Sequence, residues 1–260
     1  QKDSLSVNIN EITSLAAGTL FNDNGFGADH PGTPSAAVAS FGGGTLGGDE
    51  TSYVQGSTQA FAGGNITVNA DGSLTVDNPT MEGNYTFSYR LVNTSGFSNA
   101  EVVISILSIP MAQDDEYEFL YTADQTVDAA GGLFADNGSG GDNLAFPAAD
   151  LTSFGGGDLG GSVTDHVAGS AVSLAGGNLT VYPDGSWALT GQPFTPGIYT
   201  FDYQIGNVAG TSTATATLVI QDPPIAQKDL LIAQVNMTTS YTAGTLFADN
   251  GFGADYPGYP

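Results

Sequence analysis

Aspartate and asparagine side chains in a glycine-rich loop are the residues of this chain with the clearest capacity for chemistry. Asp23, Asn24 and Asp29 lie within the string LFNDNGFGAD, and Asp3 precedes it near the start of the chain. Calcium takes about six to eight hard oxygen ligands, and a loop of this composition can wrap around one ion. The same residue types also dominate ordinary turns, because their side chains bond local backbone and tolerate left-handed conformations. Both interpretations stay open.

The same residue set recurs twice further along the chain, which makes it the leading candidate for a cation site. Lys2 and Lys228 weaken the calcium hypothesis, since an ammonium group beside the neighbouring aspartate competes with the ion for that carboxylate. The expected cofactor is therefore calcium or none. The candidate ligands are Asp3, Asp23, Asn24, Asp29, Asp115, Asp136, Asn137, Asp142, Asp229, Asp249, Asn250 and Asp255.

Catalytic chemistry finds little support in the sequence. The chain has no cysteine, which excludes disulfides, thiolate metal sites and cysteine nucleophiles. His30 and His166 both give way to tyrosine at the matching positions of a sister repeat. No carboxylate pair stands out among the 27 acidic residues as a candidate for glycoside hydrolysis. We therefore expect no enzyme activity.

The charge balance restricts the partners of the chain. There are 27 acidic and three basic side chains, for a net charge of −24. Such a surface repels phosphate backbones and anionic lipid, so we expect neither nucleic-acid binding nor docking on a membrane. The apolar fraction of 40% is close to that of an ordinary folded domain. No apolar run approaches the length of a membrane span, so this segment is not expected to insert into a bilayer.

Long internal repeats organise the chain. The string LFNDNGFGAD from Leu20 returns as LFADNGSGGD from Leu133 and as LFADNGFGAD from Leu246, each time after 113 residues. FGGGTLGG and the AGGN strings recur at the same interval. This period predicts one full repeat over 1–112, a second over 113–226, and the opening strands of a third over 227–260. The chain is expected to be a window on a longer tandem protein.

Apolar and polar residues alternate within each repeat, which predicts half-buried strands and no helix. Asp71-Gly72 and Asp184-Gly185 separate alternating runs, as in β-hairpins. About seven or eight short strands per repeat fit an antiparallel sandwich of two sheets. The predicted fold class is all-β.

One motif resembles strand F of an immunoglobulin (Ig) domain, where a tyrosine bonds backbone and an inward residue two places later fills the core. The strings GNYTF and GIYTF have this form, with phenylalanine in place of the usual cysteine. Alternatively, the tyrosines are ordinary strand aromatics. Trp187, the only tryptophan, is expected in the core. The proposed structural residues are Tyr85, Phe87, Tyr199 and Phe201.

The order and spacing of these pieces resemble the tandem Ig-like and cadherin-like repeats of large bacterial surface and secreted proteins. The resemblance rests on the joints PMAQDDEYEF and PPIAQKDLLI, the LFADNG loop, the GGNLTVYPDGSW hairpin and the closing strands, which cover nearly all of both full repeats. It implies β-sandwich domains joined in series outside the cell, without catalysis. Many relatives bind calcium through acidic loops, but this chain lacks their dense D-x-D-x-D run.

The functional expectation is a structural segment of an extracellular self-assembling filament or surface layer, whose partners are copies of itself. The alternative is a passive stalk of a surface adhesin, whose distal head contacts glycans or neighbouring cells. A carbohydrate-binding module would need a platform of exposed aromatic residues. The single tryptophan and the alternating placement of the other aromatic residues do not supply one.

Overall fold

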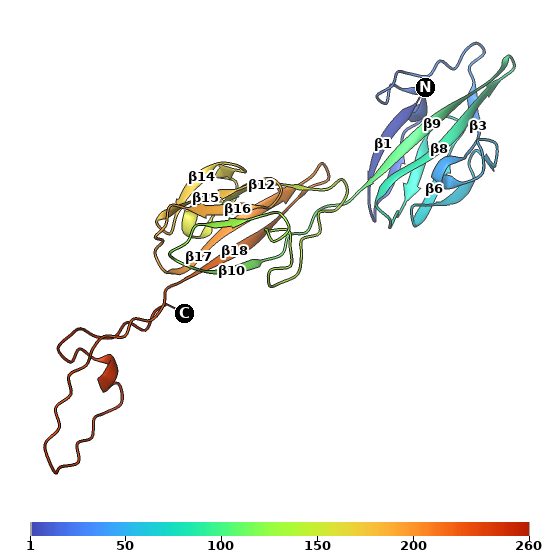
Figure 1. Ribbon diagram of the computed structural model, residues 1–260. Helices are drawn as coiled ribbons and strands as arrows, with labels where there is room; N and C mark the ends of the chain where they lie inside the picture. Colours follow the sequence, from blue (N-terminus) through green and yellow to red (C-terminus); the bar gives the residue numbers. More distant parts are fainter. Residues whose placement is uncertain (1, 260) are drawn as a thin grey trace. The chain divides into compact units, whose positions relative to one another are not determined.

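The strands predicted from apolar–polar alternation are present in both full repeats (Figure 1). The computed structural model describes residues 2–259, and in this range the regular elements are strands and short 3-10 helices. None of the helices in that range has the length and apolar character needed to cross a bilayer. The all-β prediction is confirmed.

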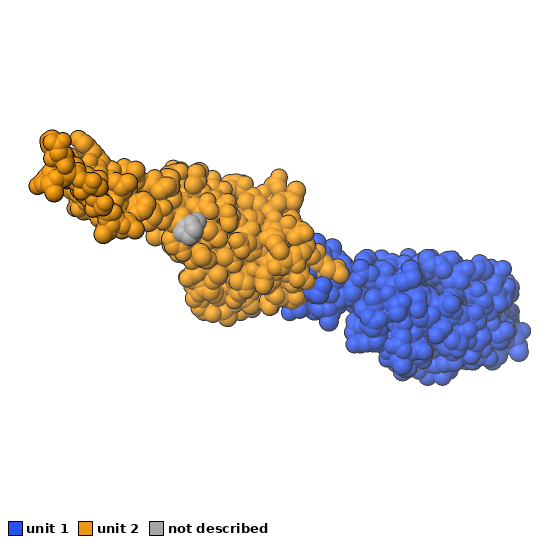
Figure 2. Space-filling view, turned by 90° about the horizontal axis from the view of Figure 1, so that it is seen from below, with its two compact units in different colours: residues 1–111, 144–149, 206–211 blue, residues 112–143, 150–205, 212–260 orange. Residues whose placement is uncertain are grey.

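The chain divides into two compact units (Figure 2). The first holds residues 1–111 with two short loops, 144–149 and 206–211. The second holds residues 112–143, 150–205 and 212–260.

The first repeat folds into two facing sheets. The five-stranded sheet has the order β1-β9-β8-β3-β4, and the four-stranded sheet has the order β2-β7-β6-β5. The strands are β1 (Asp3–Asn8), β2 (Ile12–Leu15), β3 (Ala37–Gly42), β4 (Tyr53–Val54), β5 (Thr58–Phe61), β6 (Gly64–Val68), β7 (Leu74–Asp77), β8 (Gly83–Asn93) and β9 (Gly96–Leu107).

The second repeat has the same arrangement. Its sheets have the orders β10-β18-β17-β12-β13 and β11-β16-β15-β14. The strands are β10 (Asp115–Leu120), β11 (Gln125–Val127), β12 (Asp150–Gly155), β13 (His166–Val167), β14 (Ala171–Leu174), β15 (Gly177–Val181), β16 (Trp187–Thr190), β17 (Gly197–Gly206) and β18 (Thr211–Gln221).

One strand pair in each repeat departs from the expected antiparallel arrangement. β1 pairs with β9 in parallel, and β10 pairs with β18 in the same way. Antiparallel neighbours can be joined by a hairpin, whereas these pairs bring together the first and last strands of a repeat. The chain leaves β1 for β2 in the other sheet, so its direction is not set by a turn.

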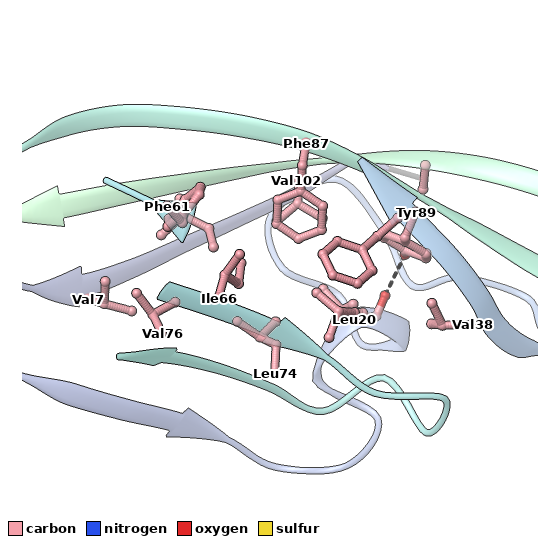
Figure 3. Close-up of a cluster of buried hydrophobic side chains, with 14 of the residues drawn as sticks. Val7, Leu20, Val38, Phe61, Ile66, Leu74, Val76, Phe87, Tyr89 and Val102 are labelled. Atoms are coloured by element: carbon pink, nitrogen blue, oxygen red, sulfur yellow. Dashed lines mark hydrogen bonds between the residues drawn. The ribbon is translucent and has the colours of Figure 1, made fainter. Parts of the chain in front are cut away.

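The core lies between the two sheets and is built mainly from aromatic and β-branched side chains (Figure 3). Phe87 of β8 is fully buried and packs edge-on against Phe41, with ring centroids 6.2 Å apart. Phe201 occupies the matching place in the second repeat and is also fully buried. Trp187 is buried as predicted and lies edge-on to Tyr117, at 4.9 Å between centroids.

Two glycines show why the recurring glycine motifs are needed. Gly72 has a positive φ of 76° in the loop between β6 and β7, where the hairpin was predicted. A Cβ at this position would lie 2.9 Å from the ring of Phe21. Gly44, in the FGGG segment, packs so closely on β8 that a Cβ would meet the backbone of Thr86. Both positions require the absence of a side chain.

Residues 227–259 differ from the expectation of opening strands, because they contain no strand and only the short 3-10 helix η4 (Thr245–Phe247). In the first repeat, β1 is a strand through its ladder with β9. No such ladder is present along residues 229–234. Leu20 is fully buried in the first repeat, whereas its counterpart Leu246 is 56% exposed.

Candidate functional site

The first aspartate of each full repeat is buried at the start of the first strand. Asp3 begins β1 and is 1% exposed. Its Oδ1 accepts a hydrogen bond from Asn24 Nδ2 at 2.8 Å, and its Oδ2 accepts one from the Tyr89 hydroxyl at 3.1 Å. Burial raises the pKa of Asp3 and outweighs these two hydrogen bonds, and the charge of Asp29 adds to the increase.

Tyr89, on β8, is the centre of this cluster. Its hydroxyl lies 2.8 Å from Leu20 O, the contact drawn as a dashed line in Figure 3, and 2.5 Å from Asp29 Oδ2. With Asp3, the hydroxyl therefore has three oxygen neighbours. It carries one proton and donates to one of them at a time. The cluster joins β1, the loop after β2 and β8 at one point.

The second repeat builds the same cluster around Tyr203 of β17. The Tyr203 hydroxyl lies 3.0 Å from Asp115 Oδ2, 3.2 Å from Asp142 Oδ1 and 2.6 Å from Gln113 O. Burial raises the pKa of Asp115 to about 7, against the hydrogen bonds from Tyr203 and Asn137. Burial also raises the pKa of Asp142 to about 6. Burial and these two carboxylates raise the pKa of Tyr203, so its hydroxyl stays protonated as a donor.

The loop asparagine ties the aspartate that precedes the loop to the backbone of the loop in all three copies. Asn24 Nδ2 also donates to Thr19 O at 2.6 Å, and Asn137 Nδ2 donates to Gly132 O at 2.7 Å. Asn250 Nδ2 bonds Asp229 at 2.8 Å and Thr245 O at 2.5 Å. The asparagine therefore turns its nitrogen, and not its oxygen, toward the aspartate.

The aspartate directly before the loop asparagine shapes a turn. Asp23 Oδ1 accepts hydrogen bonds from the backbone N–H groups of Gly25 at 3.0 Å and Gly27 at 2.9 Å. Asp249 makes the same two contacts at its own loop, and Asp136 accepts from Gly140 N at 3.1 Å. These contacts match the turn interpretation of the loop sequence.

In this arrangement the polar atoms that a calcium site would use have hydrogen-bond partners within the protein. In the first repeat the asparagine presents its nitrogen and Asp23 caps backbone amides, which leaves Asp3 and Asp29 facing a phenol. Within residues 2–259 no group of three or more acidic or histidine side chains is placed to hold a metal ion. Among the predicted ligands, Asp23, Asp136 and Asp249 thus shape turns. Asp255 Oδ1 accepts a hydrogen bond from Gln227 N at 2.6 Å, and the others lie in the hydrogen-bonded clusters of their own copies.

The tyrosines that hydrogen-bond backbone lie four residues after the ones that the sequence singled out. Tyr85 and Tyr199 are half-buried, and the structure gives neither hydroxyl a hydrogen bond within residues 2–259. The ring of Tyr85 packs on Phe61 with centroids 5.3 Å apart. Residues 85, 87 and 89 alternate onto one face of β8, so the pattern alone does not separate the two tyrosines. Tyrosine recurs at both pairs of positions, 85 with 199 and 89 with 203, so recurrence does not separate them either.

Comparison with models of protein families finds no match, and comparison with curated proteins finds none either. Extracellular domains 3–5 of Drosophila OTK are 14% identical over 84% of this chain and 60% of that chain, with a TM-score of 0.42. An I-band fragment of titin is 8% identical over 87% and 65%, at 0.37. The insect immune protein hemolin is 10% identical over 85% and 45%, at 0.35.

This chain spans less than two thirds of each of those three chains. Its fold class rests on the two-sheet sandwich in each repeat. The chain is an all-β protein of tandem Ig-like sandwiches.

The hydroxyl of Tyr89 should contribute measurably to the stability of the first repeat. We expect Tyr89→Phe to lower the free energy of unfolding by about 1 to 3 kcal/mol, because Asp3, Asp29 and Leu20 O lose the one proton donor that they share. Tyr85→Phe is the matched control and should cost about 0.5 kcal/mol or less. Chemical denaturation measures both. Equal losses at the two positions would contradict the role given to Tyr89.

The raised pKa values in the second repeat predict a pH dependence of its stability. Asp115 has an ordinary pKa of 3.8 when unfolded and about 7 in the fold, so the folded state binds the proton more tightly. Its favourable contribution is complete below about pH 4 and is lost as the pH rises to about 7. Asp115→Asn should reduce this slope and leave the repeat at least as stable at pH 8.

Glu116→Gln is the control for that experiment, since it removes the same charge from an exposed neighbour. Calorimetric melting of the three proteins from pH 4 to pH 8 measures the effect. An unchanged slope in Asp115→Asn would show that the pH dependence comes from other groups, and would contradict the role given to Asp115.

Because the predicted ligands are already bonded within the fold, calcium should act only by screening charge. We expect calcium and magnesium at equal ionic strength to raise the unfolding temperature equally, relative to chelator in low salt. A larger rise in calcium would show a specific site, because a ligand at 100 times its dissociation constant adds about 2.7 kcal/mol. Thermal melting in the three buffers distinguishes these outcomes.

Proposed function

We propose that this chain is a non-catalytic structural segment of an extracellular tandem-repeat protein that associates with copies of itself in a filament or surface layer. The proposal rests on one observation: the residues that recur make structural contacts within their own repeat. Asp23 shapes a turn, Asn24 ties a strand to a loop, and Gly44 lets two backbones approach. Residues that recur in each repeat thus maintain the framework of that repeat.

An exposed apolar residue recurs on one edge of both sandwiches. Val54 of β4 is 66% exposed, and Val167 of β13 is 70% exposed. Both strands are the last in their five-stranded sheets and are only two residues long. A short edge limits strand addition, so contacts there would be made by side chains. A weak contact repeated along an array gains strength from multivalency.

The acidic surface opposes such association at low salt. A net charge of −24 makes copies repel one another, and the repulsion is screened within about 8 Å at physiological ionic strength. Self-association should therefore increase with salt as well as with protein concentration.

Sedimentation velocity across a concentration series, in low and high salt, tests the proposal. We expect larger species at high concentration, more of them in high salt. The double change Val54→Thr and Val167→Thr should reduce them. Val208→Thr is the control, because Val208 is 78% exposed and the first repeat already has threonine at the matching position. A single monomeric species under all conditions would overturn self-assembly and favour a passive stalk.

A further inference from the structure

The first repeat has a groove at the end of its long β8–β9 hairpin. The groove has a volume of about 250 Å³ and lies between the loop after Asp29 and the turn that joins the two strands. Its lining combines apolar and hydrogen-bonding side chains. Among the residues that line it are Pro31, Leu91, Asn93, Phe97 and Ser98.

The loops at the matching positions of the sequence are 144–149 and 206–211, and they hold a peptide segment. The segment follows β9 and begins at Ser108; it belongs to the same unit as the two loops. Ser108 N donates to Phe146 O at 2.9 Å, and Phe146 N donates to Ser108 Oγ at 2.9 Å. Asn207 Nδ2 donates to Ser108 O at 3.0 Å. The segment is therefore bound as an extended strand would be.

Side-chain packing completes this arrangement. Ile109 lies so close to Gly210 that a Cβ on the glycine would be 3.2 Å from it. Further along the segment, Ala112 N donates to Ser212 Oγ at 3.1 Å. The segment thus makes both apolar and polar contacts.

A second copy of the pairing occurs near the end of the chain. Ile225 and Tyr256 exchange two backbone hydrogen bonds, at 2.7 and 2.8 Å. Tyr259 N donates to Asp222 Oδ1 at 2.5 Å, as Phe146 N donates to Ser108 Oγ. The segment after the last strand of a repeat therefore pairs twice in this chain with the loop that corresponds to the groove.

The groove of the first repeat carries the same binding groups. Asn93, Gly96 and Ser98 correspond to Asn207, Gly210 and Ser212. Asn93 Oδ1 accepts from Ser95 N at 2.8 Å and from Gly96 N at 3.1 Å, as the second-repeat asparagine does in its own turn.

The two asparagines differ in one contact. Both donate to a proline carbonyl at 2.7 Å, that of Pro34 or Pro147. An amide nitrogen has two hydrogens, and Asn207 gives its second to Ser108 O. The structure gives Asn93 Nδ2 no acceptor besides Pro34 O within residues 2–259, and Asn93 lines the groove. The two glycines differ in the same way. A Cβ placed on Gly210 would contact Ile109, whereas a Cβ placed on Gly96 would have no atom within 4 Å.

We infer that the groove of the first repeat is a docking site for the connecting segment of another repeat of this kind. The occupant is an extended peptide with the chemistry of Ser108–Met111 and of Asp222–Ile225. Both have an oxygen-bearing side chain first, then an apolar residue and a proline. Asn93 Nδ2 donates to its first carbonyl, Gly96 gives room to its apolar side chain, and Ser98 Oγ accepts a later N–H. The inference depends on the proposed function only in taking another repeat as the partner.

The test uses the full chain labelled with ¹⁵N and a synthetic peptide of residues 106–113. We expect saturable shifts of the Asn93 side-chain amide, while that of Asn207, already bonded, serves as the internal reference. A peptide with Ile109→Asp should bind about ten-fold more weakly, or worse, because the buried apolar side chain is lost. Equal affinity of the two peptides would overturn the inference.

Protein variants separate docking from folding. Ser98→Ala should weaken peptide binding about five-fold through loss of one hydrogen bond. Ser95→Ala is the matched control and should bind normally, since the second repeat has Ala209 at that position. Equal affinity of Ser98→Ala and Ser95→Ala would contradict the role of Ser98.

If the free peptide binds too weakly to be detected, the same segment can be attached covalently to the protein. Residues 107–112 are placed before Gln1, which corresponds to Gln113, so that the local concentration reaches about the millimolar range. The Asn93 amide should shift and the first repeat should melt at a higher temperature. No shift with either the peptide or the extension would overturn the inference. A monomeric result in sedimentation would instead count against self-association and leave docking standing.

Discussion

A single buried phenol determines how each sandwich is closed. The first strand of a repeat pairs with the last in parallel, so no hairpin fixes its place or its register. Tyr89 supplies the missing constraint in the first repeat, because its hydroxyl meets the aspartate that begins β1 and the carbonyl of Leu20. Tyr203 does the same for β10. The strand, the loop and the centre of the sheet are thereby held at one point.

The cluster around each phenol has an electrostatic cost, which is seen in the raised pKa values of its aspartates. A phenol with one proton faces two carboxylates, and burial removes the water that would otherwise stabilise their charge. The result is a raised pKa at Asp3 and values of about 7 and 6 at Asp115 and Asp142. The same loop satisfies its other aspartate with backbone amides, as Asp23 shows. The acidic loop is therefore a structural joint with a proton-dependent centre.

The segments that follow the last strand of each full repeat are also held by a few specific contacts. The segment that begins at Ser108 is bound mainly through its own backbone atoms. Its side chains are constrained at Ser108, which accepts from Phe146 N, and at Ile109, which packs on glycine. The later segment uses an aspartate where the first uses a serine, and the backbone pairing is kept. Main-chain recognition of this type tolerates differences between repeats, which suits an array whose units have diverged.

The sequence by itself determined the repeats, the all-β class, the hairpins and the buried places of Phe87, Phe201 and Trp187. These follow from local rules, because alternation sets the face of each residue and glycine marks positive φ or close approach. Tertiary structure decided the parallel first strand and the choice of Tyr89 over Tyr85. It also decided the use of the loop aspartates, which composition leaves open between cation binding and turn formation. Each of these depends on which distant oxygen or donor is brought within about 3 Å, and chain spacing carries no such information.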